Sequence, residues 1–320
     1  PLQAFTSLKL ADSFQSSAAL EFHGQLSFIK GGLVYADRIV TVSPSYAREI
    51  TTPAFGAGME GLLQYRNSHL TGILNGVDYD VWDPRHDLLI YSQYWTNRLA
   101  GKTNNKLCLQ HELGLAENGK AILLGFIGRL TEQKGFDLIL ANLTDIMKAE
   151  DIQVVILGEG NNRDRELLLN AAATYSGRMA VNFSYSEVLA HRIQAAADIL
   201  LMPSRFEPCG LSQLYALRYG TIPVTSLTGG LIDTIVDTNA FSLQNRTATG
   251  FHFSLETPGD FPATVLRAIN LCRNDKGTWR RLMRTAMKQE FSWDNSAKQY
   301  SSHYQDILAA RTASLKNPVV

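Results

Sequence analysis

Residues 121–135 read AILLGFIGRLTEQKG, and this stretch decides the fold. The first seven residues are apolar almost without interruption, which indicates a strand that is buried on both faces. Gly128 and Arg129 end this strand, and a run with helical spacing of apolar residues begins after Gly135. A buried strand that leads directly into a helix is typical of the parallel sheets of α/β proteins.

The same alternation of short apolar runs and longer helical patterns continues downstream. We therefore expect a Rossmann-like α/β unit, with a parallel sheet and helices on both faces, over residues 119–255. The predicted strands are 121–127, 153–157, 179–183, 199–202 and 222–225, and the predicted helices are 135–148, 163–173, 187–196, 211–219 and one that opens near residue 229.

The first 75 residues resemble part of a second α/β unit. Here the pattern predicts a helix over 22–35, a strand over 38–42 and a helix opened by Pro44. Two or three strands cannot form a stable sheet alone, so this unit is expected to be incomplete. Residues 76–84 are rich in turn formers and are predicted to link the units. The region after residue 260 is predicted to be helical.

Composition excludes several classes of protein. Thirty Lys and Arg balance thirty Asp and Glu among 320 residues, which disfavours a nucleic-acid partner. No apolar run approaches the roughly 20 residues of a membrane helix. Cys108, Cys209 and Cys272 are too few and too far apart for a disulfide framework or a zinc cluster, and fit a reducing, cytosolic compartment. Since Pro1 is not an initiator Met, we expect the sequence to begin inside a longer protein.

The loop after the first strand of the Rossmann-like unit carries two cations. Arg129 offers a rigid fork of donors and Lys134 a mobile point charge, both near the positive N-terminus of a helix. At the carboxyl edge of a parallel sheet, this pair suits a diphosphate. From the loop alone, ordinary solvent-exposed side chains are an equally good interpretation.

A second loop, residues 204–212, follows another strand at the same edge. The helix that begins near Leu211 offers free backbone amides to an anion. Because a carboxylate repels phosphate, Glu207 fits better as an acceptor for sugar hydroxyls, with a helix-dipole partner as the alternative. We expect Cys209 to position the backbone rather than act as a nucleophile, since no His neighbours it in sequence.

Two further features lie at the same edge. Paired glycines in Thr228-Gly229-Gly230 let the backbone approach a ligand closely, although tight packing is an equally good explanation. Tyr185 follows a predicted strand and could stack on a nucleobase. Three other patterns are set aside: residues 101–103 lack the glycine of a P-loop, 158–160 fit a strand-to-helix turn, and 30–33 fit a helix.

Seven segments together resemble the bacterial glycogen synthase and plant starch synthase family. The likeness covers nearly the whole chain in order, and implies a retaining glucosyltransferase of the GT-B type, with two Rossmann-like domains. It also implies transfer of glucose from ADP-glucose to the non-reducing end of an α-1,4-glucan, with no metal or other cofactor. The segments are Glu21–Lys30, Val42–Ile50, Asn75–Asp78, Gly128–Leu130 with Lys134, Pro203–Tyr215, Thr228–Leu231 and Phe291–Trp293.

The resemblance assigns a role to each candidate residue. Arg129 and Lys134 would hold the diphosphate and stabilise the departing ADP, while Glu207 would bind glucose hydroxyls and Tyr185 would lie against adenine. No carboxylate nucleophile is evident near the site, so a front-face route assisted by the leaving phosphate is favoured. The sugar and phosphate would also meet Gly128, Thr228, Gly229, Gly230 and the backbone of Cys209, Gly210, Leu211 and Ser212.

The resemblance also sets the expected domains and location. Residues 1–75 would be a remnant of the acceptor-side domain, 76–84 the linker, 85–290 the nucleotide-sugar domain and 291–320 a helix that crosses back. The expected location is the bacterial cytoplasm, or the plastid stroma in a plant or alga, with no membrane or nucleic-acid partner.

Two departures from the family pattern bear on activity. The Lys-x-Gly-Gly-Leu loop and the His-Asn segment of the family are absent from this sequence, so this stretch alone is expected to lack full activity. Tyr215 stands where many relatives in the wider fold have a second glutamate, as is usual for the synthase branch. Two alternatives stay open: a non-catalytic nucleotide- or glucan-binding relative, and a transferase that uses a UDP-sugar.

Overall fold

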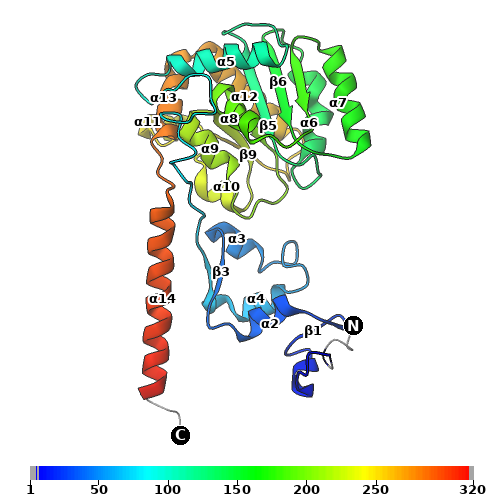
Figure 1. Cartoon of the computed structure of the whole chain (residues 1–320), viewed down its shortest axis with the longest axis vertical. Coiled ribbons are helices and arrows are strands. Elements are labelled where there is room, and N and C mark those ends of the chain that lie inside the picture. The colour runs from blue at the N-terminus through cyan, green and yellow to red at the C-terminus, as the bar shows by residue number, and fades with distance from the viewer. Residues whose placement is uncertain (1–4, 6, 317–320) are drawn as a thin grey trace. The chain divides into compact units, whose positions relative to one another are not determined.

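The computed structural model describes residue 5 and residues 7–316, and the chain divides into two compact units (Figure 1). The larger unit is Gly76–Trp293, and the smaller one combines Pro1–Asn75 with Asp294–Val320. Each unit has its own cluster of buried apolar side chains. No helix in the described ranges combines the length and the apolar character needed to cross a bilayer.

A parallel sheet of six strands forms the centre of the larger unit, in the order β10-β9-β8-β5-β6-β7. The chain adds β6 and β7 on one side of β5 and then β8, β9 and β10 on the other, so the direction of winding reverses between β5 and β8. This confirms the predicted Rossmann-like fold. The strands are β5 Ile122–Ile127, β6 Ile152–Leu157, β7 Met179–Asn182, β8 Ile199–Met202, β9 Ile222–Ser226 and β10 Phe251–Phe253.

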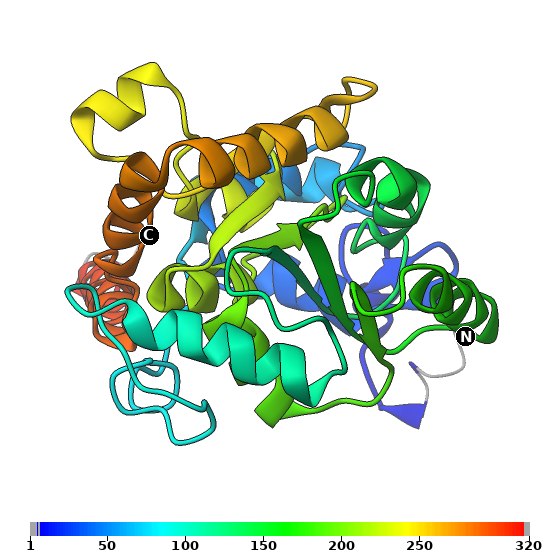
Figure 2. The same cartoon turned by 90° about the horizontal axis from the view of Figure 1, so that it is seen from above.

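Successive residues of β5 enter cores on opposite faces of the sheet. Ile122 and Leu124 pack in the cluster of α6 and α12, whereas Leu123 packs in that of α5 and α8. Figure 2 shows the sheet between α5 and α12. Because both faces of β5 are buried, its sequence is apolar without interruption. The helices of this unit are α5 Ala100–Glu112, α6 Phe136–Ile146, α7 Asn162–Thr174, α8 Glu187–Ala196, α9 Ser212–Tyr219, α10 Gly229–Thr234, α11 Ala240–Asn245, α12 Asp260–Asn274 and α13 Lys276–Met287.

The smaller unit has a β-hairpin at the start of the region where the sequence predicts a helix. Strands β1 (Glu21–Phe22) and β2 (Gln25–Leu26) pair across a two-residue turn of His23 and Gly24, both with positive φ. Such a turn favours a hairpin, so the prediction of a helix from residue 22 is wrong. Helix α2 (Phe28–Tyr35) begins six residues later, where the Ser27 side chain accepts a hydrogen bond from the backbone N–H of Lys30.

The rest of the smaller unit follows the predicted pattern more closely. Strand β3 (Ile39–Thr41) pairs in parallel with β4 (Leu70–Gly72). Pro44 is the first residue of α3, and Ser43 caps that helix by accepting from the Tyr46 amide. The remaining elements are η1 Asp12–Gln15, α3 Pro44–Glu49, α4 Glu60–Tyr65, η2 Asn67–His69 and α14 Trp293–Lys316, whose residues from Asp294 belong to this unit.

Residues 76–84, predicted as a linker, lie within the larger unit. The Val77 amide donates to the carbonyl of Phe291 at 2.7 Å. Asp83 is buried and forms an ion pair with Arg218 of α9. The segment is therefore fixed by a buried charge and by backbone pairing, although its turn-forming residues resemble a flexible connection.

Candidate functional site

The loops that follow β5 and β8 meet at the point where the sheet reverses its winding. Gly135 lies so close to the second loop that a Cβ added there would be 1.8 Å from the carbonyl oxygen of Pro203, and its φ of +66° also favours glycine. The Arg205 amide donates to the Gln133 carbonyl at 2.8 Å. Ligands of open α/β sheets bind at this position.

Lys134 and Glu207 form an ion pair across these two loops. The Nζ atom of Lys134 lies 2.5 Å from Oε2 of Glu207, and the same carboxylate accepts a hydrogen bond from Ser204 Oγ at 3.0 Å. The Glu207 side chain is only 8% exposed and that of Lys134 is 24% exposed. Because little solvent surrounds this pair, removal of either partner would leave the other as a buried, unpaired charge at a high cost in free energy.

Arg129 is connected to the loop of Glu207 by hydrogen bonds through the Gln133 side chain. Its Nη2 donates to Gln133 Oε1 at 3.2 Å, and Gln133 Nε2 donates to the carbonyl of Phe206 at 3.4 Å. Within the ranges that the structure describes, no direct bond joins Arg129 to Glu207. The guanidinium is exposed, so it is open to an anionic ligand.

A second arginine holds the loop in place and was given no role in the sequence analysis. Arg205 forms a two-pronged ion pair with Asp137 of α6, at 2.7 and 2.6 Å. The hydrogen bonds from Arg205 hold the pKa of the Asp137 carboxyl below its usual range. The loop after β8 is thereby tied to the start of α6, next to Lys134.

The third predicted loop packs against the second. The Gly230 amide donates to the Glu207 carbonyl at 3.0 Å, and a Cβ on Gly230 would lie 2.2 Å from the Cys209 carbonyl oxygen. Packing alone therefore accounts for Gly230. Cys209 itself is buried.

Gly210 and Leu211 lie at the start of α9. Gly210 has φ +74°, and the Gln213 side chain donates to the carbonyls of Cys209 and Gly210 at 2.9 and 3.0 Å. The N-cap residue, Leu211, has no side-chain oxygen, so it caps none of the first amides of α9. The backbone from Cys209 to Ser212 therefore turns into a helix end that favours an anion.

Tyr185 lies in the loop between β7 and α8 and is 83% exposed, so its ring is open to stacking. Burial raises the pKa of Tyr215 on α9, and the charges of Glu187 and Tyr185 raise it further.

A stack of three rings was missed by the sequence analysis. The centroid of the Trp82 ring lies 3.9 Å from that of Tyr215 at an interplanar angle of 1°, and on its other face 3.6 Å from that of His191 at 19°. His191 Nδ1 lies 2.8 Å from the Asp87 carboxylate, which also accepts from Tyr219 at 2.5 Å. The only signal in the sequence was a tryptophan within a turn-rich segment predicted to be a linker.

The described residues contain no group of three or more His, Cys, Asp or Glu side chains arranged to hold a metal ion.

Comparisons with known proteins agree with the fold. The model for the starch synthase catalytic domain matches residues 1–65, and that for glycosyl transferases group 1 matches residues 112–273. The catalytic domain of starch synthase IV from Arabidopsis thaliana, solved with ADP and acarbose, is similar in structure with a TM-score of 0.87 and 32% identity, over 93% of this chain and 62% of that one.

Curated bacterial proteins are similar over almost the whole chain. Glycogen synthase 2 of Nitrosococcus oceani is 52% identical over 99% of this chain, and the glycogen synthase of Thioalkalivibrio sulfidiphilus is 46% identical over 97%. In each case the chain spans 64% of the relative's length.

The parallel sheet and its close structural match define an α/β protein of the GT-B type. More narrowly, the chain belongs to the glycosyl transferases group 1 family and resembles glycogen and starch synthases along its length.

Proposed function

We propose that this protein is a glycogen or starch synthase, which transfers glucose from ADP-glucose to the non-reducing end of an α-1,4-glucan with retention of configuration. The observation that carries the proposal is the Lys134–Glu207 ion pair, 2.5 Å long, at the switch point of the sheet. The 52% identity to a glycogen synthase supports the choice of substrates.

The diphosphate of the donor would bind to positive groups on both loops. Arg129 and Lys134 come from the loop after β5, and the amides at the start of α9 come from the loop after β8. When the bond between glucose and ADP breaks, negative charge develops on the departing phosphate oxygen. Cations and amides that are already in place stabilise that charge without reorganisation.

Glu207 would bind hydroxyl groups of the glucose. Its Oε2 atom already accepts from Lys134 and Ser204, so the carboxylate is held in one orientation. A carboxylate engaged in this way is a poor nucleophile but a good acceptor for sugar hydroxyls. Retention would then follow a front-face route, in which the departing phosphate takes the proton of the acceptor hydroxyl as the new glycosidic bond forms. The route uses no metal.

The exposed ring of Tyr185 would stack on the adenine. Stacking tolerates either a purine or a pyrimidine, since both bases have a flat π-face. The preference for ADP over UDP is therefore supported by the resemblance to glycogen synthases and not by this contact.

The direct test is a glucan-extension assay on the protein encoded by the whole gene. Transfer of labelled glucose from ADP-glucose to glycogen is expected, with about tenfold or greater preference over UDP-glucose. Product NMR should give the α-anomer. A preference for UDP-glucose would reassign the donor. If the protein binds ADP by calorimetry but transfers no glucose, it is a nucleotide-binding relative without catalysis.

A further inference from the structure

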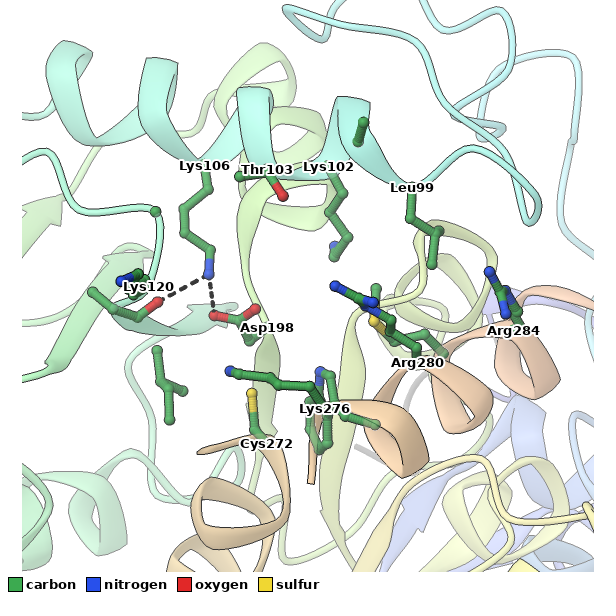
Figure 3. Close-up of a pocket in the computed structure, with 16 residues that line it drawn as sticks. Leu99, Lys102, Thr103, Lys106, Lys120, Asp198, Cys272, Lys276, Arg280 and Arg284 are labelled. Atoms are coloured by element: carbon green, nitrogen blue, oxygen red, sulfur yellow. Dashed lines mark hydrogen bonds and ion pairs between the residues drawn. The ribbon is translucent and has the colours of Figure 1, made fainter. Parts of the chain in front are cut away.

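A polar cavity lies in the larger unit (Figure 3). Its lining residues Ala121, Ile122 and Asp198 stand at the amino-terminal ends of β5 and β8, whereas the candidate site follows the carboxyl ends of these strands. The cavity has a volume of about 510 Å³ and is lined by α5, the start of β5, Asp198 before β8, the end of α12 and α13. Strand β5 separates Ile122, at this cavity, from Gly128 in the candidate site. Its six residues span roughly 20 Å, so the two places cannot share one small ligand.

Two buried lysines form the inner wall of the cavity. Lys102 Nζ donates to Thr221 Oγ1 at 2.7 Å and to two backbone carbonyls. Lys106 Nζ lies 2.6 Å from Asp198 and 2.9 Å from the Ala121 carbonyl, as Figure 3 shows. Asp198 also accepts from the Leu123 amide. The only carboxylate among the lining residues is therefore already neutralised by Lys106.

Four cations remain around the mouth of the cavity. In the described ranges, the charged ends of Lys120, Lys276 and Arg280 take part in no hydrogen bond or ion pair, while Arg284 donates to the Thr96 carbonyl at 3.2 Å. No acidic side chain lines the mouth to balance them. An acidic group outside the lining, Asp151, lies close enough to Lys276 to feel its charge but is already paired with Arg273 at 2.6 and 2.9 Å. Positive charge therefore exceeds negative charge on this concave surface.

Helix α13 concentrates this charge on one side. Lys276, Arg280 and Arg284 follow one another at intervals of four residues, and the helix contains no Asp or Glu. Like charges at this spacing repel and cost a helix about 0.2–0.5 kcal/mol per pair. An anion bound in the cavity would attract all three cations and so offset their mutual repulsion.

The walls between the cations are apolar. Leu99, Ile122, Trp279 and Met283 line the cavity beside the charged residues. Ile122, Trp279 and Met283 are already buried by the protein, so the apolar surface open to a ligand comes mainly from the half-buried Leu99 and from the aliphatic stems of the lysines and arginines. The volume admits a small organic molecule but not a folded polyanion such as double-stranded nucleic acid.

We propose that this cavity is a binding site for a small organic phosphate with at least two anionic groups, separate from the donor site. Lys276 and Arg280 contact its phosphates, and Leu99 together with the aliphatic stems of the charged side chains contacts its carbon skeleton.

The test is calorimetric titration of the whole protein with fructose 1,6-bisphosphate and with inorganic pyrophosphate, in saturating ADP so that the donor site is filled. Saturable binding of the bisphosphate is expected. The double variant Lys276→Gln/Arg280→Gln should weaken it by about tenfold or more, because each substitution removes a charge-assisted hydrogen bond. Both side chains are exposed, and unchanged ADP affinity would establish that the variant is folded.

Arg281→Gln is the matched control, since Arg281 is on the same helix and does not line the cavity. It removes the same charge and should leave binding within about twofold. The proposal is overturned if the bisphosphate does not bind in the presence of ADP, whether or not pyrophosphate binds. It is also overturned if the double variant binds like the wild type, or if Arg281→Gln weakens binding as much as the double variant. Lys134→Ala distinguishes the two sites, because it should weaken the binding of ADP and leave the affinity for the bisphosphate unchanged.

Discussion

The ammonium group of Lys134 and the carboxylate of Glu207 lie 2.5 Å apart although 73 residues separate them in the sequence. Each follows a different strand, and the two strands lie on either side of the point where the sheet reverses. The fold thus places a cation, which can bind a diphosphate, beside a carboxylate, which can accept hydrogen bonds from sugar hydroxyls. Recognition of a nucleotide-sugar requires both groups.

Lys134→Ala should lower turnover by about 100-fold or more, since the departing phosphate loses its mobile cation. Glu207 would remain buried without its charged partner, so we also expect the protein to lose about 1–3 kcal/mol of stability. Steady-state kinetics with ADP-glucose and thermal unfolding check the two effects. Lys148→Ala is the control because the Lys148 side chain, 73% exposed, forms only a surface ion pair with Asp145.

Glu207→Gln should separate binding from catalysis. The substitution removes a negative charge beside the diphosphate and frees Lys134 from its ion pair, so ADP should bind about two- to tenfold more tightly. Glucose transfer should fall by about 100-fold, because the amide cannot hold the sugar hydroxyls as the carboxylate does. Weaker ADP binding together with normal transfer would contradict the role assigned to Glu207.

Gly230→Ala should destabilise the larger unit by about 2 kcal/mol or more, since the new methyl group would overlap the backbone of Cys209 at 2.2 Å. Gly32→Ala is a useful comparison, because an added Cβ there meets no atom within 4 Å inside α2. Alanine should stabilise that helix by about 0.5–1 kcal/mol. Differential scanning calorimetry distinguishes the two, and equal effects would show that packing does not explain Gly230.

Lys102 should make stability depend on pH. Its pKa is lowered from 10.5 to about 7, chiefly because burial disfavours the charged form. The nearby Asp198 opposes this shift, and the positive charge of Lys106 adds to it. Between these values the unfolded chain binds the proton and the folded protein does not, so stability rises with pH. Relative to Lys102→Met, the wild type should gain about 2 kcal/mol from pH about 7 to about 9. Urea unfolding of both proteins tests this, and parallel pH profiles would refute it.

Much of the larger unit could be predicted because its signals are local. The run at 121–127 is apolar on both faces, so its strand was evident from the sequence alone. The approach of Lys134 to Glu207 also follows from local reasoning, because parallel strands have their carboxyl ends at one edge. Whether these residues act as assigned is still a prediction.

The rest depends on contacts that no local pattern encodes. The turn at His23 and Gly24 was hidden in a run with helical spacing, so a hairpin was predicted as helix. Trp82 meets Tyr215 only after the chain has folded over 133 residues, and this explains why a packed segment resembled a linker. The basic cavity joins Lys106 and Lys276, which are likewise far apart in sequence.

The central claim is that a nucleoside diphosphate binds at the Lys134–Glu207 pair, and calorimetric titration with ADP tests it most directly. We expect the wild type and Lys148→Ala to bind with equal affinity and Lys134→Ala to bind about tenfold or more weakly. Equal affinity in all three proteins would contradict the account, because the diphosphate would then lie elsewhere.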